Sequence, residues 1–313
     1  NQSSIGSIGK AELPFLFTKA QDAVSWNGQV QQNLFSDQYA QYVANVTTYF
    51  PTDRYEINMS WVNSVWTGLY IQIVPQLQTI FENKAINKLN LTEEDRAKTE
   101  AEAAYAGGVF EVSPDDDALA LNNVADINPL SQMSDWNEFR MSATMESVMT
   151  GTDDPRISEY WIPAVASGTY EGLRNGLSVE QLGDPMNTAP TNSHIGPRWS
   201  SPAAGGISDY LSTPSNVMFT AEAYFLRAEG ALMGWNMGGT AQELYEDGIR
   251  HSMYQWGVTD DAVIDDYINS TSAPTPPNDF LNSPALSDVP VLFDGADQAV
   301  QLEQIALQKW IAL

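Results

Sequence analysis

The sequence predicts a mainly α-helical fold in which long irregular loops separate the helices. Three observations support this prediction. Apolar residues recur at helical spacing over residues 217–258, shorter stretches elsewhere in the chain have the same spacing, and three long segments rich in glycine or proline lie between them. With 313 residues, of which 43% are hydrophobic, the chain is long enough to bury a sizeable core.

The strongest helical signal is a pair of helices between Val217 and Val258. Apolar residues of the first helix recur at i, i+3, i+4, i+7, i+10, i+11 and i+14, which is one helix face. They are Ala221, Tyr224, Phe225, Ala228, Ala231, Leu232 and Trp235. Small residues at Ala228 and Gly248 predict that the two backbones approach closely. The pair resembles a tetratricopeptide-type hairpin, which needs neighbours to bury its faces. We therefore expect a scaffold of such hairpins, of which the sequence holds one clear copy.

Four further helical stretches are expected. The first covers residues 11–50, and the second covers 57–88 with a kink or break at Pro75. An alanine-rich helix over 93–108 is stopped by Gly107 and Gly108. Another covers 136–149 and is closed by Gly151.

The remaining segments, 110–135, 162–215 and 270–294, are predicted to be loops. Loops of this length are uncommon in compact domains unless they have a function or are disordered, and aromatic residues in the second one favour function. We therefore expect a single domain over 1–313. Its helical scaffold would comprise about 11–108 and 217–313, and its ligand face would come from about 110–215.

The charge of the chain restricts its partners. Fourteen basic and 40 acidic residues give a formal net charge of −26, which would repel a phosphate backbone and excludes nucleic acid as an expected partner. The acidity is explained either by the solubility of a secreted protein or by an uncharged ligand. The chain holds no cysteine, so it offers neither a disulfide nor a lipid-bearing N-terminal cysteine.

Enzyme motifs are missing from the sequence. It contains no G-x-S-x-G, H-E-x-x-H, Walker A or G-x-G-x-x-G pattern, and its two histidines, His194 and His251, lack the partners of a catalytic triad. Asp115, Asp116 and Asp117 lack the alternating spacing and the glycine of a calcium loop, so a solvated turn is expected and calcium is the minor alternative. No cofactor is expected.

Aromatic residues in loops are the candidates for ligand contact, because sugar rings stack on aromatic faces while amides and charged groups bind their hydroxyls. Trp199 lies in a loop of Pro, Gly and Ser and either stacks on a sugar or fills space under the loop. The segment 51–61 offers five more candidates, each with a structural alternative. These are Asp53, Arg54, Tyr55, Asn58 and Trp61.

Three weaker candidates come from the entrance and middle of the long loop. They are Trp161, Tyr170 and His194. The other tryptophans fall on predicted helices, where core packing is the better interpretation. They are Trp26, Trp66, Trp235, Trp256 and Trp310.

Several segments resemble the SusD/RagB family. Residues 221–258 (AEAYFLRAEGALMGWNMGGTAQELYEDGIRHSMYQWGV) resemble the helical hairpin near the C-terminal end of these proteins, and 303–313 the helix that follows it. Residues 137–164 and 168–178 (GTYEGLRNGLS) resemble the middle of the family, and 42–70 its N-terminal region. These segments occur in family order and touch most of the chain.

The resemblance implies a fold and a role. Family members are surface lipoproteins of the outer membrane of Bacteroidetes, with tetratricopeptide-like scaffolds and loops that form the ligand face. They cover a TonB-dependent, SusC-type transporter and deliver oligosaccharides or, in some cases, peptides to it. Any contact with the membrane would be through an N-terminal lipid that this chain does not carry. The sequence departs from the family pattern in two places: helical hairpins expected from the resemblance are skipped near Asn90 and Leu91, and a family segment is expected after Leu313.

We therefore expect non-catalytic binding of a poly- or oligosaccharide, with a neutral, glucan-like glycan as the preferred class. The alternative is a helical-repeat module that binds a peptide or protein. A glycoside hydrolase is the third hypothesis, and it would need two carboxylates facing each other across the sugar bond.

Overall fold

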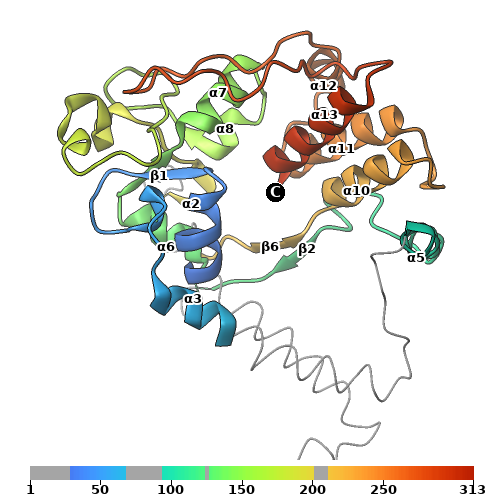
Figure 1. The fold of residues 1–313 in the computed structure, drawn as a ribbon, viewed down its shortest axis with the longest axis horizontal. Coiled ribbons are helices and arrows are strands. Elements are labelled where there is room, and N and C mark those ends of the chain that lie inside the picture. Colours follow the sequence, from blue (N-terminus) through green and yellow to red (C-terminus); the bar gives the residue numbers. More distant parts are fainter. Residues whose placement is uncertain (1–28, 68–93, 124–126, 201–210) are drawn as a thin grey trace, which may run out of the picture.

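The computed structural model describes residues 29–67, 94–123, 127–200 and 211–313, and within them the fold is mainly helical. Figure 1 shows a helical part on the right and a mixed part on the left, where short helices surround a small sheet. The expected helix over 11–28, the continuation of 57–88 beyond Thr67, and Asn90 and Leu91 lie outside the described residues.

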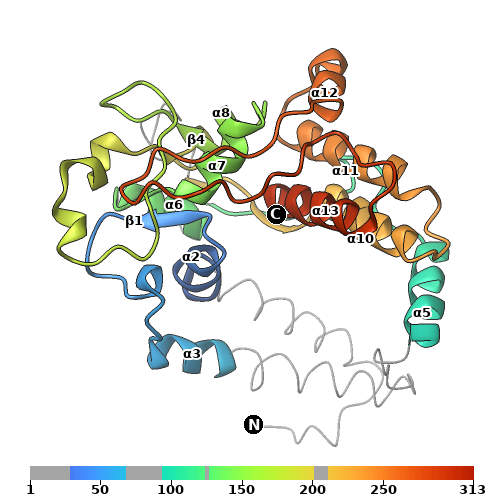
Figure 2. The ribbon, with the colours of Figure 1, turned by 45° about the horizontal axis from the view of Figure 1, so that its top comes forward.

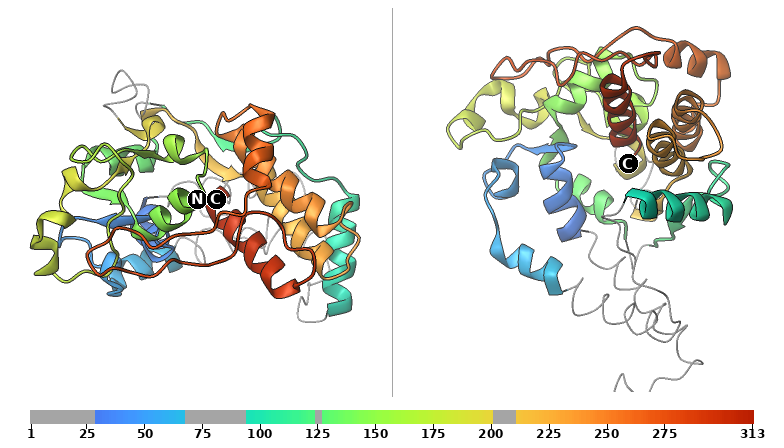
Figure 3. Two further views of the ribbon diagram at one scale, coloured as in Figure 1. Left: turned by 90° about the horizontal axis from the view of Figure 1, so that it is seen from above. Right: turned by 45° about the vertical axis from the view of Figure 1, so that its right-hand side comes forward.

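Five helices form the helical part. They are α5 (Glu94–Ala106), α10 (Thr220–Leu232), α11 (Ala241–Gln255), α12 (Asp261–Ile268) and α13 (Gln298–Ala312). Their apolar faces share one core, which is centred on Phe225, Tyr245 and Ile249. In both views of Figure 3, α13 lies on the side of α10 and α11 that faces the mixed part.

The predicted hairpin is confirmed as α10 and α11. Gly234 and Gly238 adopt positive φ values of 77° and 81° in the connecting turn, a conformation that glycine adopts without strain. Thr240 and Glu243 form a reciprocal capping box that begins α11. A Cβ added to Gly248 would lie 2.7 Å from the Phe225 ring, so the predicted close approach depends on this glycine. The predicted helix over 93–108 is confirmed as α5.

The mixed part contains further short helices. They are η2 (Gln29–Ser36), α2 (Asp37–Tyr39), η3 (Thr52–Arg54), α3 (Met59–Trp66), α6 (Pro129–Asp135), α7 (Ala143–Gly151) and α8 (Ile157–Tyr160). The chain also forms β1 (Val43–Asn45), β3 (Phe139–Met141), β5 (His194–Ile195) and β4 (Trp161–Ile162), which make one antiparallel sheet in that order.

Two helix predictions for this part are wrong. The continuous helix over 136–149 is interrupted because Asn137 has a φ of 59°, and residues 139–141 then pair with β1. Helix α7 begins afresh where Ser142 Oγ accepts a hydrogen bond from the Met145 amide. Val43, expected on a helix, lies in β1, since pairing with Met141 buries both side chains.

Long irregular segments complete the fold. Over the described residues of 162–215, the chain forms β5 and four single 3₁₀ turns, as the loop prediction requires. These turns are η5 (Gln181–Gly183), η6 (Pro185–Asn187), η7 (Ala189–Thr191) and η8 (Pro197–Trp199). A ribbon of β2 (Ala118–Ala120) and β6 (Ser215–Met218) runs between the two parts. Figure 2 shows residues 270–297 crossing from α12 over the mixed part and returning to α13.

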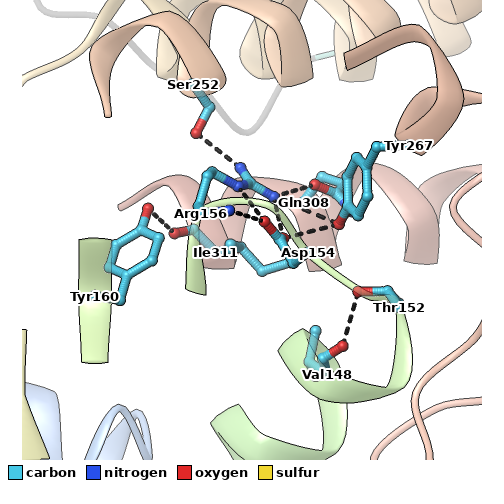
Figure 4. A network of polar contacts seen from close by, with 9 residues as sticks. All are labelled: Val148, Thr152, Asp154, Arg156, Tyr160, Ser252, Tyr267, Gln308 and Ile311. Carbon is cyan, nitrogen blue, oxygen red and sulfur yellow. Dashed lines mark hydrogen bonds and ion pairs between the residues drawn. The ribbon is translucent and has the colours of Figure 1, made fainter. Parts of the chain in front are cut away.

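A buried ion pair ties the mixed part to the helical part (Figure 4). Arg156 and Asp154, which precede α8, are fully buried and 2.6 Å apart. The Arg156 guanidinium also donates to Ser252 Oγ of α11 at 2.8 Å and to Gln308 Oε1 of α13 at 3.0 Å. Tyr267 of α12 donates to the Asp154 carboxylate at 2.9 Å. Three helices are thus held against one loop.

The second core lies under the sheet and extends into the helical part. It contains Phe139, Met141 and Trp161 of the mixed part. It also contains Trp256, which directly follows α11, and Ile311 of α13. Helix α13 therefore contributes residues to both cores. Among the residues that the structure describes, no helix is both long and apolar enough to span a bilayer.

Candidate functional site

The segment 51–61, singled out in the sequence, connects β1 to α3. Its residues Thr52–Arg54 form η3, and Tyr55 follows with a left-handed backbone, φ 59° and ψ 24°. The Asn58 side chain accepts hydrogen bonds from the amides of Ser60 (3.0 Å) and Trp61 (3.3 Å) and so begins α3. The Asn58 side-chain oxygen is therefore used for capping.

Asp53 fixes this segment to a second one. It is buried, and the Asn175 side-chain amide donates a 2.6 Å hydrogen bond to its carboxylate, while the Gly176 amide donates to its carbonyl at 2.9 Å. Burial raises the pKa of Asp53 to about 7, although the bond from Asn175 acts in the opposite direction. These two hydrogen bonds to the buried Asp53 hold residues 175–176 in place.

Arg54 is engaged locally. Its guanidinium donates to the Thr48 carbonyl at 3.2 Å and lies 3.6 Å from the Glu56 carboxylate. The side chain is largely covered, at 15% exposure. These contacts hold the loop before η3.

Tyr55 is the candidate whose ring is available. It is 48% exposed, and its phenol oxygen accepts a 2.6 Å hydrogen bond from the Gln41 side-chain amide. Its ring lies 6.0 Å from that of Tyr39, tilted by 43°. The opposite edge is close to Gly176, where an added Cβ would lie 3.4 Å from the ring. Tyr55 is therefore held in one orientation with a free surface.

A groove of about 430 Å³ begins next to this pair of rings. It runs between the end of α2, the start of α7, residues 286–287 and α13. It is lined by Tyr39, Ala40, Gln41, Thr144, Leu286, Ser287, Glu303, Ala306, Leu307 and Trp310. Its lining therefore combines two aromatic rings, an amide, two hydroxyls and a carboxylate, and among the described lining residues none is basic.

Gln41 connects the groove to Tyr55. Its backbone is left-handed, with a φ of 61°, and its side-chain carbonyl accepts a hydrogen bond from Thr144 Oγ1. Ser142 Oγ donates to the Gln41 carbonyl. Three contacts to α7 and Tyr55 thus compensate for a backbone conformation that is uncommon outside glycine.

Trp310 forms the far wall of the groove. Tyr42 stacks on it with centroids 5.1 Å apart and planes 21° apart, and Trp310 Nε1 donates to the Ala40 carbonyl at 3.2 Å. Trp310 was expected to pack in the core, and neither Tyr39 nor Gln41 was a predicted site residue. Helical spacing places Trp310 on an apolar stripe, but only the contacts of Ala40 and Tyr42 with Trp310 make that stripe the side of a groove.

Three predicted tryptophans are packed into the second core. Trp199 is 6% exposed and meets Trp256 at a centroid distance of 5.5 Å and an angle of 61°. Trp161 is 5% exposed in β4. Trp61 is half-buried, with its ring 6.3 Å from Phe50. The rings of Trp199 and Trp161 offer no open face for a sugar in this structure, which agrees with the space-filling alternative for Trp199.

Two further candidates, Tyr170 and His194, come from the long loop region of 162–215. Tyr170 is half-buried against the second core, and burial raises its pKa. His194 lies in β5, with Nδ1 3.0 Å from the Ile195 carbonyl, and burial lowers its pKa. The structure therefore connects Asp53 and Tyr55 through residues 175–176, whereas His194 lies in β5 and Tyr170 packs against the second core.

The three consecutive aspartates are used in a turn. Asp116 accepts hydrogen bonds from the amides of Glu111 and Val112, and Asp117 accepts one from the Thr220 amide at 2.8 Å. Within the described ranges, no group of three or more His, Cys, Asp or Glu side chains could hold a metal ion.

Comparisons with known proteins identify the family. The model of the SusD-like family, described as Susd and RagB outer membrane lipoprotein, matches residues 85–313. A comparison with curated protein sequences gave no match.

Solved structures show the same fold. A chitin-binding SusD homolog from Flavobacterium johnsoniae is 24% identical, with a TM-score of 0.68 over 96% of this chain and 83% of its own. A homolog from Bacteroides vulgatus is 24% identical, with a TM-score of 0.72 over 92% and 78%. One from Bacteroides thetaiotaomicron is 22% identical, with a TM-score of 0.71 over 95% and 82%.

The family match covers well over half of the chain, and the fold agrees with it. Helices α10 to α13, which carry the strongest sequence resemblance, all lie within the matched residues. The chain belongs to the SusD-like family of outer membrane lipoproteins, whose members are non-catalytic binding proteins.

Proposed function

We propose that this chain binds an uncharged oligo- or polysaccharide at Tyr39, Gln41 and Tyr55 and along the adjoining groove. The observation that carries the proposal is the Tyr55 ring, which is half exposed but fixed by Gln41 and Gly176 next to a second tyrosine. The bound glycan would then be delivered to a SusC-type TonB-dependent transporter.

The chemistry of the site suits a sugar. Rings of Tyr55, Tyr39 and Trp310 present apolar surface to the C–H faces of pyranoses, and their fixed orientation reduces the entropy lost on binding. The Gln41 amide and the hydroxyls of Thr144 and Ser287 can exchange hydrogen bonds with sugar hydroxyls. A groove of about 430 Å³ lies within the range of roughly 300–1,000 Å³ of pockets for small ligands.

Charge favours an uncharged ligand over an anionic one. Glu303 is the charged residue among those that line the described groove, and the whole chain has a formal net charge of −26. A sulfated or uronate-rich glycan would approach a negative surface without a basic partner in the groove.

The other predicted residues of this segment support the site in the proposal. The hydrogen bond from Asn175 to Asp53 holds residues 175–176 next to Tyr55. Asn58 begins α3, the helix that follows Tyr55 in the chain. Trp199 and Trp161 are left out because they are buried, His194 because it lies in β5, and Tyr170 because it packs against the second core. We infer one functional unit over 1–313, since the groove joins residues 39–41 to α13.

The choice of glycans for a test follows from the relatives. The homolog from Flavobacterium johnsoniae binds chitin, which is an uncharged polymer. Chitin oligosaccharides therefore belong beside α- and β-glucans in the set of ligands, with a uronate-rich and a sulfated polysaccharide as the anionic comparison.

Isothermal titration calorimetry of the wild type, Tyr55→Ala and Tyr254→Ala against this set tests the proposal. Tyr254 is the matched control, a partly exposed tyrosine on α11 whose hydroxyl is bonded to Asp261 at 2.7 Å. We expect at least one uncharged glycan to bind the wild type and Tyr254→Ala, and Tyr55→Ala to lose about 10-fold or more in affinity.

Two results would overturn the proposal. If Tyr55→Ala and the wild type bound glycan with equal affinity, the proposed location of the site would be refuted. If only the anionic polymers bound, the proposed class of uncharged ligands would be refuted. If no glycan binds but peptides do, the helical-repeat hypothesis replaces it. Release of reducing sugar during the titration would indicate hydrolysis. Co-purification of the tagged chain with a TonB-dependent transporter from native membranes tests the delivery step.

A further inference from the structure

A second pocket, of about 240 Å³, lies in the loop-rich region and shares no lining residue with the groove of Trp310. It is formed by residues 166–171, by η6 and η7, and by residue 278 of the long segment that precedes α13. Ala166, Ser167, Glu171, Met186, Thr191, Asn192 and Asn278 line it. Five of these seven side chains can form hydrogen bonds, and among the described lining residues none is aromatic or basic.

The walls of this pocket are fixed by hydrogen bonds. Asn192 is buried, and its side-chain amide donates to the carbonyls of Met186 (3.0 Å) and Thr188 (2.9 Å). Thr188 and Thr191 form a reciprocal capping box around η7. The Ala166 amide donates to the Pro190 carbonyl at 2.9 Å, which joins the two loops. The pocket is therefore formed before any ligand enters it.

Glu171 is oriented by two donors. Thr169 Oγ1 donates to one carboxylate oxygen at 2.7 Å, and Asn278 Nδ2 donates to the other at 3.0 Å. Asn278 is itself anchored, because its backbone amide donates to the Glu146 carboxylate at 2.8 Å. An ionised carboxylate has about four acceptor positions, so each oxygen of Glu171 retains capacity for a further donor.

Ser167 extends the same network. Its Oγ accepts a hydrogen bond from the Thr169 amide (3.2 Å). Because the single Thr169 hydroxyl proton goes to Glu171, the Ser167 hydroxyl donates to Thr169 Oγ1 (2.8 Å) and keeps one acceptor position. Glu171 and Ser167 therefore both offer acceptor positions to a ligand, and vicinal hydroxyls of a sugar can donate to the two.

The size and charge of the pocket restrict the ligand further. Its volume is below the roughly 300–1,000 Å³ that holds a drug-sized molecule, so the bound unit is small. A carboxylate without a basic neighbour in the lining excludes anions, and Met186 offers one apolar contact for a C–H face.

We propose that this pocket is a second saccharide site, which holds a single uncharged sugar unit through its hydroxyls. The ligand class rests on the proposed function, but the location does not. Because the two sites are separate, a long glycan that reaches both binds more tightly than either site alone allows, whereas a short one does not gain.

Substitution of Ala166, an exposed residue at the pocket, tests the proposal without removing a buried contact. Ala166→Trp fills the pocket, and Val165→Trp is the matched control, since Val165 is 88% exposed and does not line it. Glu171→Gln is a second variant of nearly the same shape. Thermal unfolding of each variant shows first whether it is folded.

Ligand-observed NMR with glucose, galactose and N-acetylglucosamine is then recorded on the wild type and all variants. We expect one monosaccharide to give a binding signal with the wild type, Val165→Trp and Tyr55→Ala. The signal should be lost with Ala166→Trp and should be weaker with Glu171→Gln. Ala166→Trp should lower the affinity for a polysaccharide that the wild type binds by about 10- to 100-fold. The loss of affinity for a disaccharide should be smaller.

The outcomes separate this inference from the proposed function. If Tyr55→Ala abolishes all saccharide binding while Ala166→Trp changes nothing, the second site is refuted and the first stands. If Ala166→Trp abolishes monosaccharide binding while Tyr55→Ala changes nothing, the second site stands alone. Absence of every saccharide signal with the wild type refutes both.

Discussion

The side-chain amide of Gln41 donates a 2.6 Å hydrogen bond to the phenol oxygen of Tyr55. Both residues have left-handed backbones, with φ values of 61° and 59°, and neither is a glycine. Such conformations cost of the order of 1 kcal/mol or more each and persist only where the surrounding structure enforces them. Here Ser142, Thr144 and Gly176 supply the contacts, so the exposed ring of Tyr55 is positioned by the tertiary structure.

Gln41→Ala is expected to weaken glycan binding. Without the amide, Tyr55 loses its orienting bond and the groove loses a polar group, so the affinity should fall about 10-fold, corresponding to about 1.4 kcal/mol. Calorimetry with the glycan that binds the wild type measures this. Gln242→Ala is the control, because Gln242 bonds only to the exposed Glu246 at 2.8 Å on the hairpin. An unchanged affinity for Gln41→Ala would show that the amide does not position the site.

Trp199→Ala is expected to affect stability and not the intrinsic affinity for glycan. The ring is buried against Trp256, and removal of a buried Trp costs about 3–5 kcal/mol. Denaturant unfolding measures the loss, and titration of the folded variant at low temperature measures the affinity. Trp136→Ala, at a more exposed ring, should cost less. If Trp199→Ala instead kept full stability and lost the glycan, Trp199 would belong to the site.

Asp53→Asn is expected to flatten the dependence of stability on pH. Burial raises the pKa of Asp53 to about 7, above its usual value of 3.8, so the folded state binds this proton more tightly than the unfolded state. The resulting stabilisation is complete below about pH 4 and is lost as the pH rises towards about 7. Because Asn cannot ionise, the variant should exceed the wild type at about pH 8 by roughly 1–3 kcal/mol.

Thermal unfolding of both proteins at about pH 4 and about pH 8 is the measurement, with the lower pH as internal control. Some pH dependence should remain in the same window, since burial also raises the pKa of Asp37 to about 6. A wild type that gains stability relative to Asp53→Asn as the pH rises would contradict the assigned sign.

Arg156→Met is expected to destabilise the fold by about 3–5 kcal/mol, because it leaves the buried Asp154 carboxylate without its partner. The loss should be visible in denaturant unfolding. Arg250→Met is the matched control, since the exposed Arg250–Asp265 pair at 2.7 Å is a surface contact worth at most about 1 kcal/mol. Equal effects of the two substitutions would mean that the Arg156 network does not hold α11, α12 and α13 in place.

The helical elements could be predicted because their signals are local. The spacing of Tyr224, Phe225 and Ala228 and the glycines of the turn predict α10 and α11, and Gly107 and Gly108 mark the end of α5. The helix over 136–149 could not be predicted correctly, because its interruption depends on the pairing of residues 139–141 with β1. That pairing joins segments about 100 residues apart, which periodicity within one window does not record.

The candidate site was predicted in part for the same reason. The turn residues and aromatic rings of 51–61 are a local signal, and Tyr55 within them is exposed. Trp199 was favoured because a loop composition suggests exposure, yet the loop folds its ring onto Trp256. Tyr39 and Trp310 were missed, because each lies on a helical stripe and only the contact of residues 40 and 42 with α13 makes them walls of a groove.

The sequence by itself determined the helical class, the hairpin, the acidic surface and the family to which the chain belongs, since each is encoded by residues close together or by composition. Tertiary structure alone decided which aromatic rings face solvent. A ring is buried or exposed according to what long-range packing places over it, and that packing covered Trp199 and Trp161 while it left Tyr55 open beside Gln41.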